Sequence, residues 1–123
     1  DGATYFVHDV VSYPEKLQVK LAGWYHVDWS VMWDNTGSNR VTVEGVWYSG
    51  SSAQTEQAYT KATKYSRGAS YGDQQNCSGS FWIELAANDI LALKMYYTDS
   101  EQTGAVNTVA GEGFVQITGW PNA

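Results

Sequence analysis

A short glycine-rich segment is the closest approach to a catalytic motif in this chain. Gly68-Ala69-Ser70-Tyr71-Gly72 fits the G-x-S-x-G pattern of a hydrolase nucleophile elbow. That elbow needs a strand before the serine, a helix after it and a histidine later in the chain. No helical pattern follows Gly72, and both histidines, His8 and His26, come before Ser70. The segment is therefore interpreted as a glycine-rich strand end, and neither a catalytic residue nor an enzymatic activity is predicted.

Potential metal ligands are widely scattered along the chain. Cys77 is the single cysteine, so no intrachain disulfide can form, and the two histidines lie on separate predicted strands. Asp34 to Asn39 offers oxygen ligands but lacks the EF-hand order of acids and glycine. We expect a tight turn there, with an ion-binding loop as the alternative, and predict no metal and no cofactor.

Positive charge is concentrated in one short segment. Lys61, Lys64 and Arg67 supply three of the seven basic residues, and Tyr65 lies among them. This pattern is typical either of a solvated strand face or of a site for an anionic group such as a carboxylate or an acidic sugar, against which a tyrosine ring can pack. Lys61, Lys64, Tyr65 and Arg67 are the predicted ligand-binding residues.

Length and composition limit the classes of protein that could use such a site. The 123 residues and 13.6 kDa suit one domain, and a chain that starts at Asp1 suggests a domain excised from a longer fibrous protein. A net charge of −6 argues against nucleic acid or an anionic membrane as a partner. Aromatic residues at 15% exclude disorder, and no apolar run approaches the roughly 18 residues of a membrane span.

Apolar and polar residues alternate with period two between scattered glycines, which predicts half-buried strands. In the segment from Trp24 to Trp33 one face is wholly apolar, while the other is mixed and suits water or a partner subunit. The apolar face comprises Tyr25, Val27, Trp29, Val31 and Trp33, and the mixed face comprises Trp24, His26, Asp28, Ser30 and Met32.

Further strands and loops follow from the same alternation. Strands are predicted at Thr4 to Val11, Lys16 to Leu21, Arg40 to Tyr48, Ser80 to Leu85, Ile90 to Tyr97 and Gly113 to Trp120, with one or two more between Gln57 and Tyr71. Gly50 to Gln57 and Gly72 to Gly79 are predicted to be polar loops. Eight or nine short strands without helices predict an antiparallel sandwich or barrel.

The aromatic residues divide into two groups. Tyr25, Trp29, Trp33, Phe81 and Phe114 are predicted to lie in the core. Trp24, Trp82, Tyr96 and Trp120 fall off the core face and are hard to bury in a lone domain. Exposed aromatic side chains of this kind indicate a subunit interface or a platform for sugar stacking, and burial in the core is the remaining alternative.

Three segments, in order, resemble tumour-necrosis-factor-like domains and the globular heads of complement-type proteins. They are Gly23-Trp24-Tyr25-His26-Val27-Asp28-Trp29-Ser30-Val31, Phe81-Trp82-Ile83-Glu84-Leu85-Ala86-Ala87-Asn88-Asp89-Ile90-Leu91-Ala92-Leu93 and Gly111-Glu112-Gly113-Phe114-Val115-Gln116-Ile117. Asn88 stands where the family usually has the glycine of a Gly-Asp turn. The resemblance covers roughly Leu17 to Thr118.

The resemblance implies an all-β antiparallel jelly-roll sandwich over residues 1–123 that assembles as a homotrimer. The family's axial face would fall on Trp24, His26, Asp28, Ser30, Ser80, Trp82, Glu84, Val115 and Ile117. Similar trimeric knobs cap bacteriophage tail fibres and tail needles, and also bacterial adhesins and spore filaments. A secreted cytokine-like ligand is a further branch of the same fold. The resulting hypothesis is a non-catalytic knob at a virion tip, otherwise extracellular or at a cell surface, that binds a host-surface glycan, a protein or a small anionic ligand. The alternative is a monomeric carbohydrate-binding or lectin-like module of a secreted protein.

Overall fold

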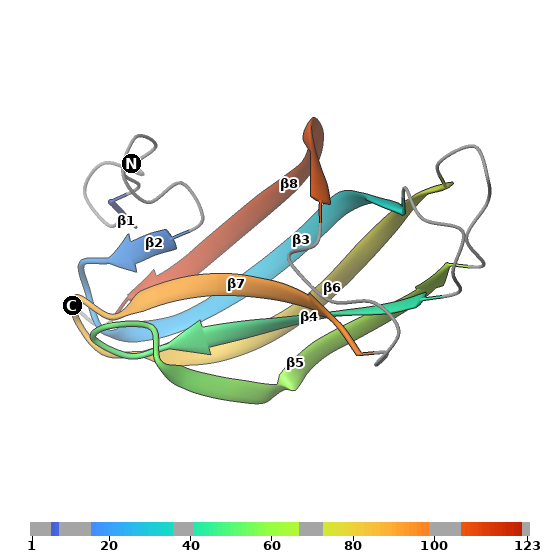
Figure 1. The fold of residues 1–123 in the computed structure, drawn as a ribbon. Helices are drawn as coiled ribbons and strands as arrows, with labels where there is room; N and C mark the ends of the chain where they lie inside the picture. Colours follow the sequence, from blue (N-terminus) through green and yellow to red (C-terminus); the bar gives the residue numbers. More distant parts are fainter. Residues whose placement is uncertain (1–5, 8–15, 36–40, 67–72, 99–106, 122–123) are drawn as a thin grey trace.

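The protein is built from two antiparallel β-sheets that face each other across one core (Figure 1). The computed structural model describes residues 6–7, 16–35, 41–66, 73–98 and 107–121. Within these ranges all regular structure is β-strand, and none of the chain described forms a helix that could cross a membrane. The prediction of an all-β, antiparallel fold is confirmed.

Eight strands are found in the described residues. They are β1 (Phe6–Val7), β2 (Lys16–Val19), β3 (Gly23–Asn35), β4 (Val41–Ser49), β5 (Thr55–Ser66), β6 (Asp73–Leu85), β7 (Ile90–Tyr97) and β8 (Asn107–Pro121). One sheet has the order β1-β2-β7-β4-β5 and the other the order β6-β3-β8. β3 is thus the central strand of the smaller sheet, paired with β6 on one side and β8 on the other.

The strand predicted at Ile90 to Tyr97 is observed with the same bounds as β7. A tight turn directly before it determines where the strand begins. Asn88 adopts a positive φ of 69°, which asparagine tolerates better than most residues. The Asp89 carboxylate accepts a hydrogen bond of 2.9 Å from the Ala86 amide, which closes the turn. This turn connects β6 in one sheet to β7 in the other.

The polar loop predicted at Gly72 to Gly79 is wrong for residues 73–79, which form the first half of β6. This half pairs with β3 from Trp29 to Asn35. Its alternation is real but inconspicuous, since Asn76 and Ser78 are exposed and Cys77 between them is buried. The loop predicted at Gly50 to Gln57 is likewise shorter, because β5 begins at Thr55.

Several predicted segments lie wholly or partly outside the described residues. Of the strand predicted at Thr4 to Val11, only Phe6–Val7 is described. Asp34 and Asn35 end β3, and the remainder of the Asp34 to Asn39 turn is outside the described part. The G-x-S-x-G segment, residues 68–72, is also outside it.

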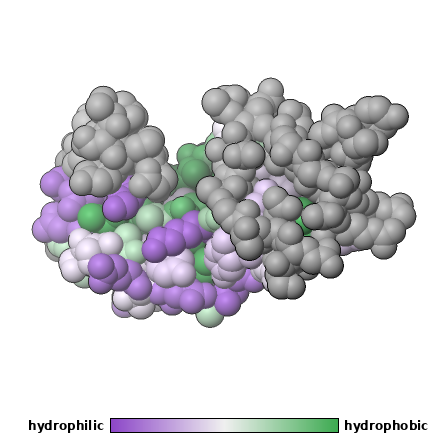
Figure 2. Space-filling model, viewed as in Figure 1, coloured by the Kyte–Doolittle hydropathy of each residue, from purple (hydrophilic) through white to green (hydrophobic). Residues whose placement is uncertain are grey.

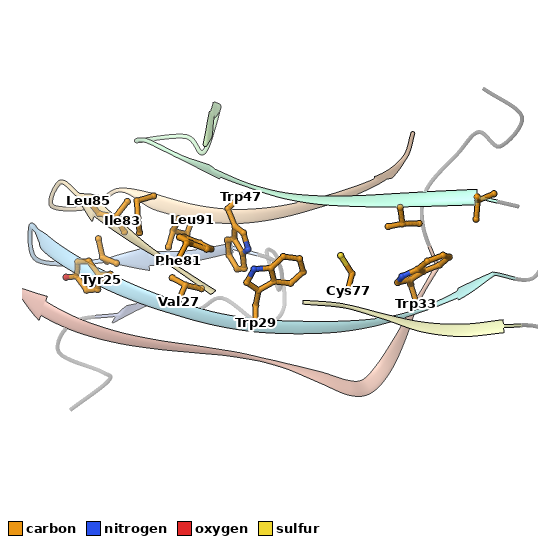
Figure 3. Packing of buried hydrophobic residues seen from close by; sticks show 13 residues of the cluster. Tyr25, Val27, Trp29, Trp33, Trp47, Cys77, Phe81, Ile83, Leu85 and Leu91 are labelled. Carbon is orange, nitrogen blue, oxygen red and sulfur yellow. The ribbon is translucent and has the colours of Figure 1, made fainter. Parts of the chain in front are cut away.

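The core lies between the sheets and is rich in tryptophan (Figure 3). Trp29 and Trp33 from β3 are buried, as predicted, and Trp47 from β4 meets Trp29 edge-on with ring centroids 6.1 Å apart. Phe81 is also buried, 5.8 Å from Trp47. The prediction that Phe114 is a core residue is wrong, because its register partner Ser30 lies on the outer face of the sheet and the phenyl ring is 56% exposed.

Two glycines from different sheets make room for Trp29. Gly79 lies directly opposite Trp29 in β6, and Gly45 comes from β4 in the other sheet. A Cβ on Gly45 would lie 2.7 Å from Trp29 Cη2, and one on Gly79 would lie 2.9 Å from Trp29 Nε1. The indole therefore fills space that any larger residue at these positions would take.

Replacing Gly45 with alanine is expected to destabilise the fold by about 1–3 kcal/mol, because the added methyl group would overlap the Trp29 indole. Urea unfolding at one fixed protomer concentration measures this cost. The Trp29→Phe background removes the outer ring atoms that the methyl group would meet, so the cost of Gly45→Ala should fall to about half or less there. An equal cost in both backgrounds would contradict this packing.

Candidate functional site

The outer face of the β6-β3-β8 sheet collects the mixed side of β3 and its neighbours. The registers β3–β6 and β3–β8 place residues from all three strands side by side. We call this surface the tryptophan face; its members are Trp24, His26, Asp28, Ser30 and Met32 from β3, Asn76, Ser78, Ser80, Trp82 and Glu84 from β6, and Phe114, Gln116, Thr118 and Trp120 from β8.

Aromatic rings dominate one end of the tryptophan face. Trp24, Trp82 and Trp120 are each half or more exposed. Trp82 and Trp120 come from the strands flanking β3, yet their rings lean together with centroids 5.1 Å apart and planes tilted by 41°. Trp24 is the direct register partner of Trp120. Contiguous exposed aromatic patches are typical of surfaces that bind a partner or a ligand.

A histidine with three neighbours lies beside this aromatic patch. The Ser80 hydroxyl is 2.9 Å from His26 Nε2, and the ring centroid of Trp82 is 4.9 Å from that of His26. On the other side of the ring, Asp28 Oδ2 is 3.6 Å from Nδ1. The contact between Ser80 and His26 depends on the β3–β6 register and was not found from the sequence.

Ser80, His26 and Asp28 lie in a row and are the residue types of a hydrolase triad, but their geometry differs from that of a triad. Activation of the serine requires a carboxylate hydrogen-bonded to Nδ1 that holds and stabilises the ring. The 3.6 Å from Asp28 Oδ2 to Nδ1 exceeds a hydrogen bond, and the Asp28 side chain is 45% exposed. We therefore interpret Ser80 as a residue that orients His26.

The other end of the tryptophan face is polar and slightly hollowed. A shallow depression of about 560 Å³ lies next to the aromatic patch. It is lined chiefly by Asp28, Ser30, Ser78, Ser80, Phe114 and Gln116. The Asn76 amide donates a hydrogen bond to the Ser30 hydroxyl at its edge. The face thus combines apolar area with hydrogen-bonding groups, as the surfaces between subunits do.

Seven of the nine predicted interface residues lie together on the tryptophan face. The other two, Val115 and Ile117, project from the opposite side of β8, since their register partners are Trp29 and Val27 of the core. Ile117 packs against that core, and Val115 is half exposed. On β8 the tryptophan face is instead formed by the alternate residues, which include Gln116 and Thr118.

The structure brings two of the predicted anion-binding residues, Lys61 and Tyr65, to one side of β5 and places Lys64 on the other. Lys64 is the register partner of Val43, a core residue, whereas Tyr65 pairs with Thr42 and so points to the other side of β5. Lys61, three residues before Lys64, lies on the same side of β5 as Tyr65, where its Nζ reaches Glu44 of β4. Lys64 is on the opposite side of the strand and is exposed. Arg67 is outside the described residues.

Carboxylates already balance the charge of Lys61. Its Nζ lies 3.0 Å from Glu56 Oε1 and 3.6 Å from Glu44 Oε1. The hydrogen bond and charge of Glu56, together with the charge of Glu44, raise the pKa of Lys61. The structure gives Lys61 a role in an ion-pair network, and the predicted ligand site gains no support from it.

This network belongs to the outer face of the five-stranded sheet, which is polar. The Tyr96 hydroxyl donates a hydrogen bond to Glu44, and this bond, with burial, raises the pKa of Tyr96 to about 12. Lys94 Nζ lies over the Tyr48 ring at 4.1 Å. Hydrophilic residues accordingly gather over β4, β5 and β7 on the visible side of the molecule (Figure 2). The outer face of this sheet thus carries ion pairs and exposed tyrosines, whereas that of the other sheet carries exposed tryptophans beside polar residues.

Neither a metal site nor a reactive thiol is evident in the described residues. They contain no group of three or more histidine, cysteine, aspartate or glutamate side chains placed to hold a metal ion. Cys77 is buried, and this burial raises the pKa of its thiol. The thiolate needed for nucleophilic chemistry is therefore disfavoured.

Comparison with known proteins does not extend this description. No family model matches the chain, and no curated protein matches it in sequence at a significant level. Function must therefore be inferred from the two-sheet fold and from the tryptophan face.

Proposed function

We propose that this chain is a jelly-roll head domain that assembles as a trimer and serves as the knob of a viral or bacteriophage tail fibre or tail needle. It acts by attaching to a host-surface molecule, with no catalytic step. The observation that carries the proposal is the exposed tryptophan face on one sheet of the domain. Two sibling copies in a ring would cover it.

The strand order supports the jelly-roll topology. A jelly roll consists of two nested Greek keys, which place the second strand beside the seventh, the third beside the sixth and the fourth beside the fifth. The neighbours β2 and β7, β3 and β6, and β4 and β5 follow this order. β1 departs from it, because it pairs with β2 and not with β8.

The contrast between the two outer faces supports the location of the subunit contact. One carries the ion pairs of Lys61 and the cation–π contact of Lys94, which are typical of a surface in water. The other carries Trp24, Trp82 and Trp120. Half-exposed rings of this size, with Phe114, offer roughly 400 Å² of aromatic surface, about half of what one partner buries in a standard interface.

A trimer would also suit attachment to a cell surface. A cyclic trimer uses a heterologous contact that closes into a ring and leaves the outer face of the five-stranded sheet exposed on every copy. Three identical sites engage a surface that displays many copies of a ligand, and the linked sites raise the effective concentration of each binding event. Weak recognition by one copy is then sufficient for firm attachment.

The mass in solution tests the assembly. We expect about 41 kDa by light scattering, which is three times the 13.6 kDa of one chain. A mass of 13.6 kDa at micromolar concentration would contradict the knob and favour a monomeric carbohydrate-binding module that uses the same tryptophans as a stacking platform. Twice the chain mass would contradict the trimer as well, because a dimer requires a self-complementary contact.

A further inference from the structure

The tryptophan face has an unbalanced set of charged groups. It carries two carboxylates, Asp28 and Glu84, and among its described residues there is neither lysine nor arginine. His26 is the one described side chain on this face that can become positive. If sibling copies cover the face, as in the proposed function on which this inference rests, the carboxylates of every copy lose water and approach one another.

Burying carboxylates without a counter-charge is costly, and like charges brought together add to that cost. A protonated imidazole beside them offsets both effects. His26 is placed for this role, because Asp28 Oδ2 lies 3.6 Å from its Nδ1 and the Trp82 ring lies against it at 4.9 Å. An aromatic ring at this distance also favours a cation over a neutral group.

Two carboxylates are the other titratable groups described around His26 on this face. Its own strand contributes Asp28, and β6 contributes Ser80, Trp82 and, one register step further along this face, Glu84. β8 contributes Thr118 directly opposite His26, flanked on this face by Gln116 and Trp120, none of which titrates. Protonation of an imidazole and protonation of a buried carboxylate would both reduce the charge imbalance on acidification, so the His26→Gln variant is the one that separates the histidine from Asp28 and Glu84.

We propose that protonation of His26 tightens the trimer, so that assembly is stronger at mildly acidic pH than at pH 8. Because the charged imidazole is favoured in the assembled state, the added stability is present when His26 carries its second proton. It is lost when the pH rises and that proton leaves. The head would therefore hold together most firmly in acidic surroundings.

Sedimentation of a dilution series between pH 5.5 and pH 8 tests the proposal. For the natural chain, the protomer concentration at which half of the trimer dissociates should fall roughly tenfold or more on acidification. His26→Gln should remove this response. His8→Gln, which changes the chain's only other histidine, should keep it. Asp28→Asn should tighten the trimer at pH 8 and weaken the response, and it provides a second route should His26→Gln fold poorly.

The outcomes separate this inference from the proposed function. Three results would overturn the role of His26 and leave the trimer standing. They are a trimer whose affinity is unchanged across the pH range, a pH response that His26→Gln keeps, and a pH response that His8→Gln loses. An Asp28→Asn variant with the full response of the natural chain also overturns it. Single chains at every pH and concentration overturn the trimer, and the inference with it.

Discussion

Replacing Trp82 with glutamate is expected to dissociate the proposed trimer into single chains of 13.6 kDa. The change removes an indole from the centre of the aromatic patch and adds a third carboxylate to a face that already holds Asp28 and Glu84. Buried aromatic residues near the centre of an interface typically contribute about 2 kcal/mol or more each, and a trimer loses three of them. Light scattering at micromolar protomer concentration provides the measurement.

Tyr65→Glu is the matched control for this change. Tyr65 and Trp82 are each 50% exposed in the single chain, but Tyr65 lies on the outer face of the five-stranded sheet. The fold should tolerate both substitutions, because both side chains are half exposed. The hydrogen bond that the Tyr59 hydroxyl donates to Trp82 goes to the backbone carbonyl and does not involve the indole. A trimer that survives Trp82→Glu and is lost in Tyr65→Glu would place the contact on the other sheet.

Replacing Trp29 with alanine is expected to lower the free energy of unfolding by about 3–5 kcal/mol, a large share of a small domain's stability. Trp29 is 1% exposed and touches residues of both sheets. The indole lies against Gly45 and Gly79, which have no side chain that could move into the cavity. Urea unfolding followed by circular dichroism measures the loss.

The comparison requires equal protein concentrations, because the proposed assembly would add to the apparent stability. Tyr65→Ala serves as the control and should change the free energy of unfolding by less than about 1 kcal/mol, since its ring is half exposed. A loss below about 1 kcal/mol for Trp29→Ala would mean that the indole does not join the two sheets.

Local alternation was sufficient to predict the inner face of β3. Tyr25, Val27, Trp29 and Trp33 are buried as expected, because on this strand every second residue is apolar and large. The same reasoning failed for the first half of β6, where small and polar residues hide the period. β6 becomes recognisable only when its full-length pairing with β3 is known.

β8 shows why a sequence pattern alone can assign residues to the wrong face. Phe114 and Val115 are adjacent and both apolar, so neither side of the strand is marked as the inner one. The register with β3 decides the matter: Phe114 lies opposite Ser30 on the tryptophan face, and Val115 lies opposite Trp29. A difference of one residue in register moves every side chain of a strand to the other face.

The amino-acid order thus specified the bounds of β7 and the two faces of β3, because these depend on neighbours within one short segment. The hydrogen bond between His26 and Ser80 and the carboxylates beside Lys61 could be known only from the folded chain. His26 and Ser80 lie on strands far apart in the sequence, and Glu44 contacts Lys61 from the neighbouring strand β4. Contacts of both kinds arise from sheet register and packing, which no short stretch of residues contains.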